Sequence, residues 1–268
     1  MLAAMNEPPT QPQTATAITV TAPLRWLALG WQDLRTNPVP GLLHGLAASI
    51  FGMLLWLWAG SQFWWLVGAF SALPLLAPVL LVGLLLLSRQ AQLGQRAGLR
   101  EVLRLWLAAD ARMVVFGVLL GLAGMAWVLI SAGLLLLWTD QAIQTPGDFF
   151  RLVVLADDSS LFVLWITLGA LLAAPVFASS VVTLPLLLDT EQPLPLAVAH
   201  SWRVVAQYPV VMVLWALLIA LLVGVGLLTG MVGLIVALPW LGHASWHAYV
   251  DLKRAGAFGL LGSWGGVQ

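Results

Sequence analysis

The sequence predicts an all-α membrane protein with six transmembrane helices and three short cytoplasmic interfacial helices. Apolar residues make up 61% of the 268 positions and charged residues only 8%, whereas a soluble domain carries about a quarter charged residues. Long stretches contain no charged residue at all, and the basic residues gather between alternate stretches. These three observations fix the fold class before any single element is considered.

Asp, Glu, Lys and Arg are absent from four stretches: 36–88, 113–139, 159–188 and 204–250. One crossing of a bilayer needs roughly 20 apolar residues, so the second and third stretches each predict one span. The first and last stretches are long enough for two, and each contains a turn, "AGSQ" (59–62) and "LLTGMVG" (227–233). The predicted spans are therefore 40–60, 63–88, 113–138, 160–188, 209–228 and 231–250.

The basic residues predict the orientation of these spans. With six spans both termini share one side, and ten of the eleven Lys and Arg residues fall on that side, leaving only Arg151 opposite. The positive-inside rule then places both termini in the cytoplasm. The formal net charge of zero gives no indication of a nucleic-acid partner, and the expected surroundings are the lipid bilayer and another membrane protein.

The ends of the chain and its missing cysteines limit the remaining possibilities. Residues 1–21 are rich in Pro, Thr and Gln and predict a disordered cytoplasmic tail, residues 22–254 form the membrane domain, and residues 255–268 form a Gly-rich cytoplasmic tail. The chain has no cysteine. Disulfides, thiolate nucleophiles, iron–sulfur clusters and covalently attached haem are thereby excluded.

A short amphipathic segment precedes each pair of spans, at 23–35, 99–111 and 195–208. In the middle segment, for example, Leu99 and Leu103 share a helical face that Arg100 does not. Such helices are suited to lying at the membrane surface. The alternative is that these segments are ordinary linkers with incidental periodicity.

The first and third units also share sequence, which predicts three parallel helix-pair repeats. "WQDLRTNP" (31–38) and "WRVVAQYP" (202–209) both place Trp and Pro seven residues apart, and "ALPLL" (72–76) is matched by "ALPWL" (237–241). The middle unit is less similar, and chance likeness among leucine-rich segments is the alternative. Prolines in the second span of each pair predict kinks: Pro74, Pro78, Pro175, Pro185 and Pro239.

The stretch "VVTLPLLLDTEQPLPLAVAHSWRVVAQYPVVMVLWALLIALL" (181–222), followed by "VALPWLGHASWHAYVDLK" (236–253), resembles a bacterial family of integral membrane proteins, the domain-of-unknown-function family 2189. "GWQDLRTNPVPGLLHG" (30–45) fits the same family. The resemblance covers roughly residues 22–254 and implies a multi-pass protein of the bacterial inner membrane. It implies no activity, substrate, cofactor or catalytic residue.

No motif predicts an enzyme. No charged side chain lies within a span, where it would suggest ion-coupled transport, and the chain contains neither a phosphate-binding "GxxxxGK[ST]" nor a "GxSxG" elbow. "HASWH" (243–247) has Ala244 where a metalloprotease of the H-E-x-x-H type carries its glutamate. The acidic stretch 140–158 could bind a cation weakly, but its scattered carboxylates favour a solvated loop.

Three histidines are the candidate metal ligands: His44, His243 and His247. His243 and His247 lie four residues apart and share a helix face, and His44 lies at a comparable depth in the first span. If the first and last spans are neighbours, the imidazoles could bind a transition metal or haem. The preferred interpretation is packing, because imidazole near an interface commonly forms hydrogen bonds between helices.

The function predicted from the sequence is that of a non-enzymatic inner-membrane protein without cofactors, which acts as a scaffold or binds a partner or lipid at the cytoplasmic face. Two alternatives are a passive transporter or channel for a small or apolar solute, with its path along the broken spans, and a haem- or metal-binding membrane protein that uses the three histidines.

Overall fold

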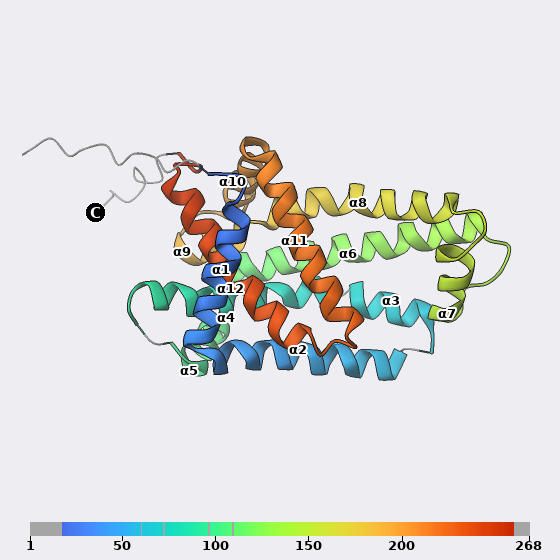
Figure 1. Ribbon diagram of the computed structural model, residues 1–268, viewed down its shortest axis with the longest axis horizontal. Coiled ribbons are helices and arrows are strands. Elements are labelled where there is room, and N and C mark those ends of the chain that lie inside the picture. The colour runs from blue at the N-terminus through green and yellow to red at the C-terminus, as the bar shows by residue number, and fades with distance from the viewer. Residues whose placement is uncertain (1–17, 60, 72, 96, 109, 260–268) are drawn as a thin grey trace, which may run out of the picture.

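The computed structural model describes residues 18–259 apart from positions 60, 72, 96 and 109, and every regular element in this part of the chain is a helix (Figure 1). The predicted tails lie largely outside the described residues. The elements are α1 (Ala22–Thr36), α2 (Pro38–Ala59), α3 (Phe63–Ser71), α4 (Leu73–Gln92), α5 (Leu99–Ala108), α6 (Ala111–Trp138), α7 (Pro146–Phe149), the π-helix η1 (Phe150–Val154), α8 (Ser160–Ser180), α9 (Thr183–Asp189), α10 (Leu194–Gln207), α11 (Pro209–Leu228) and α12 (Leu234–Arg254).

Four segments in the described part of the chain are long and apolar enough to cross a membrane: Pro38–Trp58, Ala111–Trp138, Ser160–Asp189 and Pro209–Leu228. They coincide with four of the six predicted spans, and the all-α membrane fold is confirmed. The predicted span 63–88 forms two helices, α3 and α4. The predicted span 231–250 forms α12, which carries histidine and aspartate in its second half.

Proline explains several helix boundaries. Pro185 has no N–H to donate to the carbonyl of Val181, and the chain leaves the helical path at residues 181–182, between α8 and α9. Pro38 and Pro209 are the first residues of α2 and α11, where a missing N–H costs nothing. Pro175 and Pro239 lie inside α8 and α12, which continue through them.

The bundle has two distinct ends. At the left of Figure 1, hereafter the near end, lie α1, α5, α9 and α10, and α12 ends there. At the right, the far end, α7 follows the end of α6, and the backbone N–H of Phe63 donates to the carbonyl of Gln144 at 2.7 Å. This hydrogen bond joins the α2–α3 link to the α6–α7 link, so the first two helix pairs reach the same far end.

Two corners at the near end have the same geometry. A single residue separates α1 from α2 and α10 from α11: Asn37 has φ −138° and ψ 73°, and Tyr208 has φ −127° and ψ 54°. Each precedes a proline, which disfavours helical dihedrals at the preceding residue. The Trp–Pro spacing found in the sequence therefore marks a common corner, in which a short helix turns into a long one.

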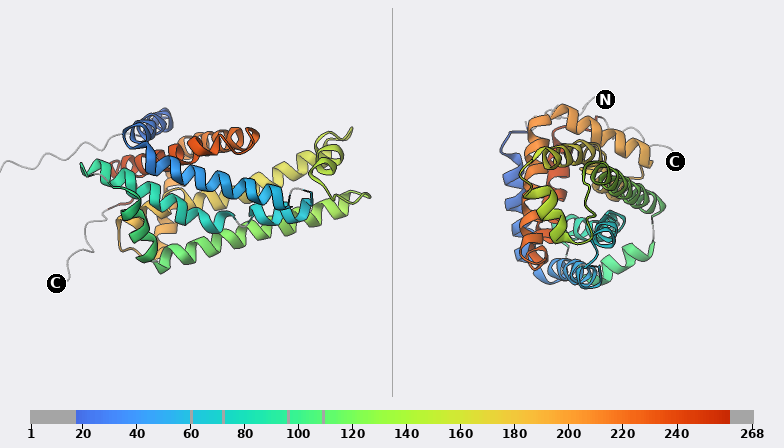
Figure 2. Two further views of the ribbon diagram at one scale, coloured as in Figure 1. Left: turned by 90° about the horizontal axis from the view of Figure 1, so that it is seen from below. Right: turned by 90° about the vertical axis from the view of Figure 1, so that its right-hand side faces the viewer.

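The last helix, α12, lies at the centre of the near end and packs on α1, α2, α4 and α11. The views in Figure 2 show it beside α1 on one flank of the bundle. The largest core cluster surrounds it and includes the fully buried Trp26, Trp215 and Tyr249. The two ends of the chain are thus held together by one core.

A row of small residues on α2 receives α12. A Cβ placed on Gly41 would lie 3.4 Å from Cβ of Pro239, and one on Gly45 would lie 2.2 Å from the carbonyl oxygen of Ile235. One turn further on, Oγ of Ser49 donates to the carbonyl of Met231 at 2.9 Å. From one contact to the next, the residue number rises by four on α2 and falls by four on α12, so the two helices run antiparallel.

Candidate functional site

Buried polar groups gather around α12 at the near end, and the first group centres on Asp33 of α1. One carboxylate oxygen of Asp33 accepts hydrogen bonds from Oγ of Ser88 at 2.6 Å and from Nε2 of His247 at 2.9 Å. Burial disfavours the charged form of this carboxyl, but the hydrogen bonds from His247 and Ser88 outweigh it, and the pKa of Asp33 lies below its ordinary value. Asp33 therefore joins α1 to α4 and α12 as an ionised group.

Two further aspartates complete the connection of α12 to its neighbours. Asp189 accepts from the hydroxyl of Tyr249 at 2.7 Å, from Nζ of Lys253 at 2.5 Å and from Nε of Arg89 at 3.2 Å. Asp251 accepts from Nε1 of Trp26 at 2.8 Å and forms an ion pair with Arg25. We call these three carboxylates with their donors the α12 polar junction.

The hydrogen bonds within the junction define the state of its histidines. Because the carboxylate of Asp33 can only accept, Ser88 donates to it, and Nδ1 of His243 must then donate to Oγ of Ser88 at 2.7 Å. Nε1 of Trp246 donates to Oε1 of Gln92, which leaves the Gln92 amide nitrogen to donate to Nδ1 of His247 at 3.4 Å. Both nitrogens of His247 thus have hydrogen-bond partners.

His44 and His243 each keep one unpaired nitrogen. Nδ1 of His44 donates to the carbonyl of Pro40 at 2.7 Å, and Nε2 of His44 and Nε2 of His243 are both buried without a hydrogen-bond partner. Glycines make room for these rings: a Cβ on Gly83 would lie 2.5 Å from Nε2 of His44, and one on Gly41 would lie 3.2 Å from Nε2 of His243. The two imidazoles fill the space between α2, α4 and α12.

The structure thus brings all three predicted histidines to one side of α4: His44 and His243 lie between α2, α4 and α12, and His247 lies between α1, α4 and α12. Within the described residues, however, no three side chains of His, Cys, Asp or Glu are grouped closely enough to hold one metal ion. Ser88 is fully buried, donates to the carboxylate of Asp33 and accepts from His243. The arrangement joins helices, and its chemistry is that of hydrogen bonding.

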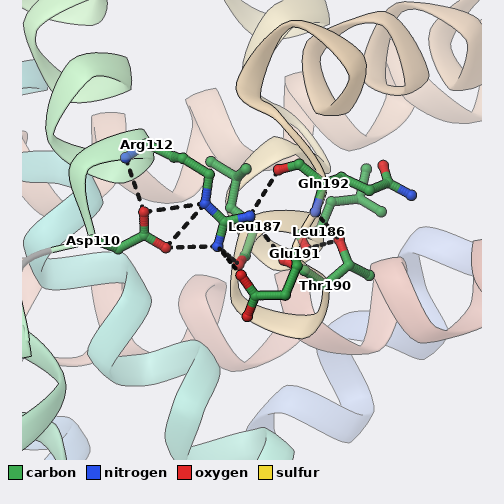
Figure 3. Close-up of polar contacts among 7 residues, drawn as sticks. All are labelled: Asp110, Arg112, Leu186, Leu187, Thr190, Glu191 and Gln192. Atoms are coloured by element: carbon green, nitrogen blue, oxygen red, sulfur yellow. Dashed lines mark hydrogen bonds and ion pairs between the residues drawn. The ribbon is translucent and has the colours of Figure 1, made fainter. Parts of the chain in front are cut away.

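A second polar cluster fixes the start of α6 (Figure 3). Nη1 of Arg112 donates to the carbonyls of Thr190 and Gln192 at 3.0 and 2.7 Å, and Nη2 donates to Asp110 at 2.7 Å and to the carbonyl of Leu187 at 3.2 Å. Nε donates to Asp110 at 3.1 Å. The hydrogen bonds from Arg112 hold the pKa of Asp110 below its ordinary value. All five N–H groups of Arg112 are in use, so it serves the fold rather than a ligand.

An apolar cavity of about 500 Å³ lies beside Arg112, between α5, α6 and α9. Most of its lining is apolar, including Leu105, Trp106, Met113, Val114, Leu187 and Leu188, and its polar side is formed by Asp110, Arg112 and Glu191. Since Val114 is 56% exposed, the cavity borders the outer surface of the bundle. Its chemistry suits an apolar group such as a lipid acyl chain.

The outer surface of α5 is the most distinctive surface at the near end. Leu99, Leu103 and Leu107 are 40, 51 and 84% exposed and follow one another at every fourth position, which places them on one face of the helix. Arg100 and Arg104 are also exposed and lie beside this row. We call these five residues the α5 stripe. The inner face of α5 packs through the fully buried Val102.

The other two predicted interfacial helices expose apolar residues in the same way. On α1 these are Leu24 and Trp31, and on α10 they are Leu196 and Trp202. Nε1 of Trp202 donates to Oγ of Ser179 at 2.9 Å, so this side chain also connects α10 to α8. Short helices lie where the sequence predicts them, at 22–36, 99–108 and 194–207.

At the far end, the acidic residues of the stretch 140–158 do not form a grouping like the α12 polar junction. In the acidic stretch 140–158, the side chain of Thr145 accepts from the N–H of Asp148, and Asp148 accepts from the N–H of Thr145, forming a capping box at the start of α7. Arg151 pairs with Asp148 at 3.4 Å. The carboxylate that the sequence offered as a weak cation ligand is thus used to begin a helix.

Sequence reasoning missed Asp33, Ser88, Gln92, Asp189 and Arg112. The partners of these residues lie far away along the chain. Those of Asp33 are 55 and 214 residues away, and the carbonyls bound by Arg112 are 75 to 80 residues away. One signal was available: Asp189 and Asp251 stand directly at the ends of charge-free stretches, beside the basic residues of the near end.

Residues 65–189 match the model of a family described as "Predicted integral membrane protein (DUF2189)". The match confirms the family resemblance seen in the sequence, although it covers the middle of the chain rather than the stretches 30–45 and 236–253. No curated protein and no solved structure matches the chain.

Proposed function

Because residues 65–189 place this chain in the DUF2189 family of predicted integral membrane proteins, we propose that it is a non-enzymatic, multi-pass protein of the bacterial inner membrane that binds lipid at its near, cytoplasmic end. The observation that carries this proposal is the α5 stripe. Exposed leucines at every fourth position suit insertion among acyl chains. The arginines beside them suit the phosphates of anionic headgroups.

The orientation follows from the same end of the molecule. Eight of the ten basic residues that the sequence assigns to the cytoplasm lie on α1, α4, α5, α10 and α12, which meet at the near end, and a ninth, Arg112, lies at the start of α6. The tenth, Arg96, lies outside the described residues. Arg151 lies beside α7 at the far end. The positive-inside rule supports a cytoplasmic near end. Any even number of crossings, six as predicted from the sequence or four, satisfies this orientation. A cytoplasmic reporter fused after Arg254 should be active, and a periplasm-dependent one should not.

The lipid proposal is tested by counting the lipids that remain bound to the purified protein in native mass spectrometry. One basic residue near an anionic surface contributes about 1 kcal/mol, so the double variant Arg100→Gln/Arg104→Gln should lower the affinity for anionic lipid by roughly 30-fold. Arg151→Gln at the far end is the matched control and should retain the lipid of the unmodified protein. Equal retention in both variants would refute lipid binding by α5 and favour a protein partner.

A further inference from the structure

The turn between α11 and α12 lies halfway along α2 rather than at the far end. Met231 in this turn contacts α2 at two places: its carbonyl accepts from Ser49, and its Sδ lies 2.7 Å from where a Cβ of Gly52 would be. Ser49 is the twelfth residue of the 22 in α2. At 1.5 Å per residue, Ser49 lies about 17 Å from the start of a helix about 33 Å long.

The part of α12 inside the bundle is therefore short. In the antiparallel register of Gly41 with Pro239 and Gly45 with Ile235, the start of α2 at Pro38 is level with Gly242. Only Leu234–Gly242 runs beside α2, a length of about 14 Å, whereas the hydrocarbon core of a bilayer is about 30 Å thick. The rest of α12 continues past the start of α2 along α1. This helix does not reach the far end.

Figure 1 agrees with this register, because the turn from α11 to α12 lies short of α7 and of the end of α2. The other two pairs do reach the far end, where Phe63 and Gln144 join them. Beyond Gly52, α2 has no α12 beside it, and its side chains are exposed: Met53, Leu54, Trp56, Leu57 and Trp58.

The composition of the turn suits an apolar environment. Leu228 and Val232 at the turn are 88% and 57% exposed, and no charged residue occurs between 204 and 250. The two links at the far end expose polar residues: Ser61 and Gln62 in the α2–α3 link, and Asp157, Asp158 and Arg151 after α7. The turn thus exposes aliphatic side chains and contains no charged residue, as a segment within the hydrocarbon core requires.

The backbone of the turn is also bonded internally. Oγ1 of Thr229 donates to the carbonyl of Gly226 and accepts from the N–H of Gly233, both at 2.9 Å. The N–H of Leu234 donates to the carbonyl of Met231, which also accepts from Ser49. Non-helical backbone at membrane depth persists only where such partners replace water. The left-handed φ of Gly230, +64°, and of Met231, +70°, closes the turn within a few residues.

We infer that α11 and α12 form a re-entrant hairpin, which enters and leaves the membrane on the near side and ends, at residues 229–233, inside the hydrocarbon core. The chain then crosses the membrane four times, through α2, α3–α4, α6 and α8–α9. Both termini stay on the same side of the membrane, as in the orientation proposed above. The topology is independent of the proposed lipid function, because it rests on the position of the turn and not on the α5 stripe. It also accounts for the polar junction, because the second half of α12 lies at the surface rather than in the membrane.

Because the chain contains no cysteine, single cysteines can report the position of the turn without any background. The test variants are Val232→Cys and Leu228→Cys, with Gln141→Cys as the far-side control and Gln95→Cys as the near-side control; all four positions are exposed. Each protein is treated with a membrane-impermeant maleimide in sealed vesicles of either orientation, and then again after denaturation in detergent.

We expect Gln141→Cys and Gln95→Cys to react from opposite sides, and Val232→Cys and Leu228→Cys to react from neither side until detergent is added. A nitroxide attached at residue 232 should collide more often with oxygen, which dissolves in lipid, than with a water-soluble nickel complex. Reaction of Val232→Cys from the side of Gln141→Cys would show six crossings and overturn the inference. Reaction from the side of Gln95→Cys would overturn it too, because the turn would then lie in water.

Discussion

Replacing Gly45 with alanine should separate α12 from α2. The new Cβ would lie 2.2 Å from the carbonyl oxygen of Ile235, 2.7 Å from its carbonyl carbon and 2.8 Å from its Cα. Ordinary contact begins at 3.4 Å, so one helix must move by the difference between 2.2 and 3.4 Å, about 1.2 Å. All three obstructing atoms belong to the backbone, and no change of rotamer can relieve the overlap.

The expected cost combines two opposing effects. Overpacking in a close interface costs about 1–3 kcal/mol, and we expect a value in the upper part of this range because a whole helix must shift. Alanine in place of glycine inside a helix contributes about 0.5–1 kcal/mol in the other direction. The net destabilisation of Gly45→Ala should therefore be about 1–2 kcal/mol.

Gly133→Ala is the matched control, because a Cβ on Gly133 of α6 meets no atom within 4 Å. This variant should gain about 0.5–1 kcal/mol from helix propensity alone. Both free energies of unfolding can be measured by titrating the protein in mild detergent with a denaturing detergent. If Gly45→Ala proved as stable as Gly133→Ala, the close approach of α2 and α12 would be wrong, and with it the register on which the re-entrant hairpin depends.

Three further predictions concern the near end. Since the pKa of Asp33 lies below its ordinary value, its carboxylate stabilises the fold above about pH 4 and loses that effect as the pH falls further. Asp33→Asn should therefore be less stable than the unmodified protein at neutral pH, and the difference in unfolding free energy should shrink in acid. A difference that does not depend on pH would contradict this. His243→Gln should lower the free energy of unfolding by less than about 1 kcal/mol, because the Gln amide can donate to Ser88 in place of Nδ1. Elemental analysis should find no stoichiometric metal or haem iron. Zinc, copper or iron that is lost in the His243 and His247 variants would show that these residues are ligands. Trp202→Ala removes the hydrogen bond to Ser179 and should speed proteolysis between residues 190 and 208. The control variant Trp58→Ala at the far end should not. Equal protection from protease in both variants would show that Trp202 does not anchor α10.

The helices themselves could be predicted because their causes are local. Charge-free stretches located four segments long enough to cross the membrane, and Pro38 and Pro209 marked the residues at which short helices turn into long ones. The amphipathic pattern around Leu99 and Leu103 located α5. In each case the residues that determine the element lie within it or directly beside it.

The contacts between helices could not be predicted, because nothing in one segment identifies its partner. The pattern around His243 and His247 showed a polar face, but that this face meets Asp33 depends on α1 lying beside α12. The depth of the α11–α12 turn was missed for a related reason. Hydropathy reports that residues 204–250 avoid water, and a hairpin that stops halfway satisfies this condition as well as two complete crossings do. The row of Gly41, Gly45 and Ser49 on α2, which sets that depth, is meaningful only once α12 is known to occupy it.

The pairing of the first helix with the last has a consequence for the time course of biosynthesis. His247, a partner of Asp33, follows it by 214 residues in the chain. A ribosome that adds 5–20 residues per second needs roughly 10–40 s to synthesise these residues. Throughout this time α1 has none of its final partners on α12, and Asp33 can bond only to Ser88 of α4, which is made earlier. A nascent chain arrested before α12 should therefore expose α1 to protease even though α2 through α9 are already inserted. Release of the complete chain is then the event that closes the near end.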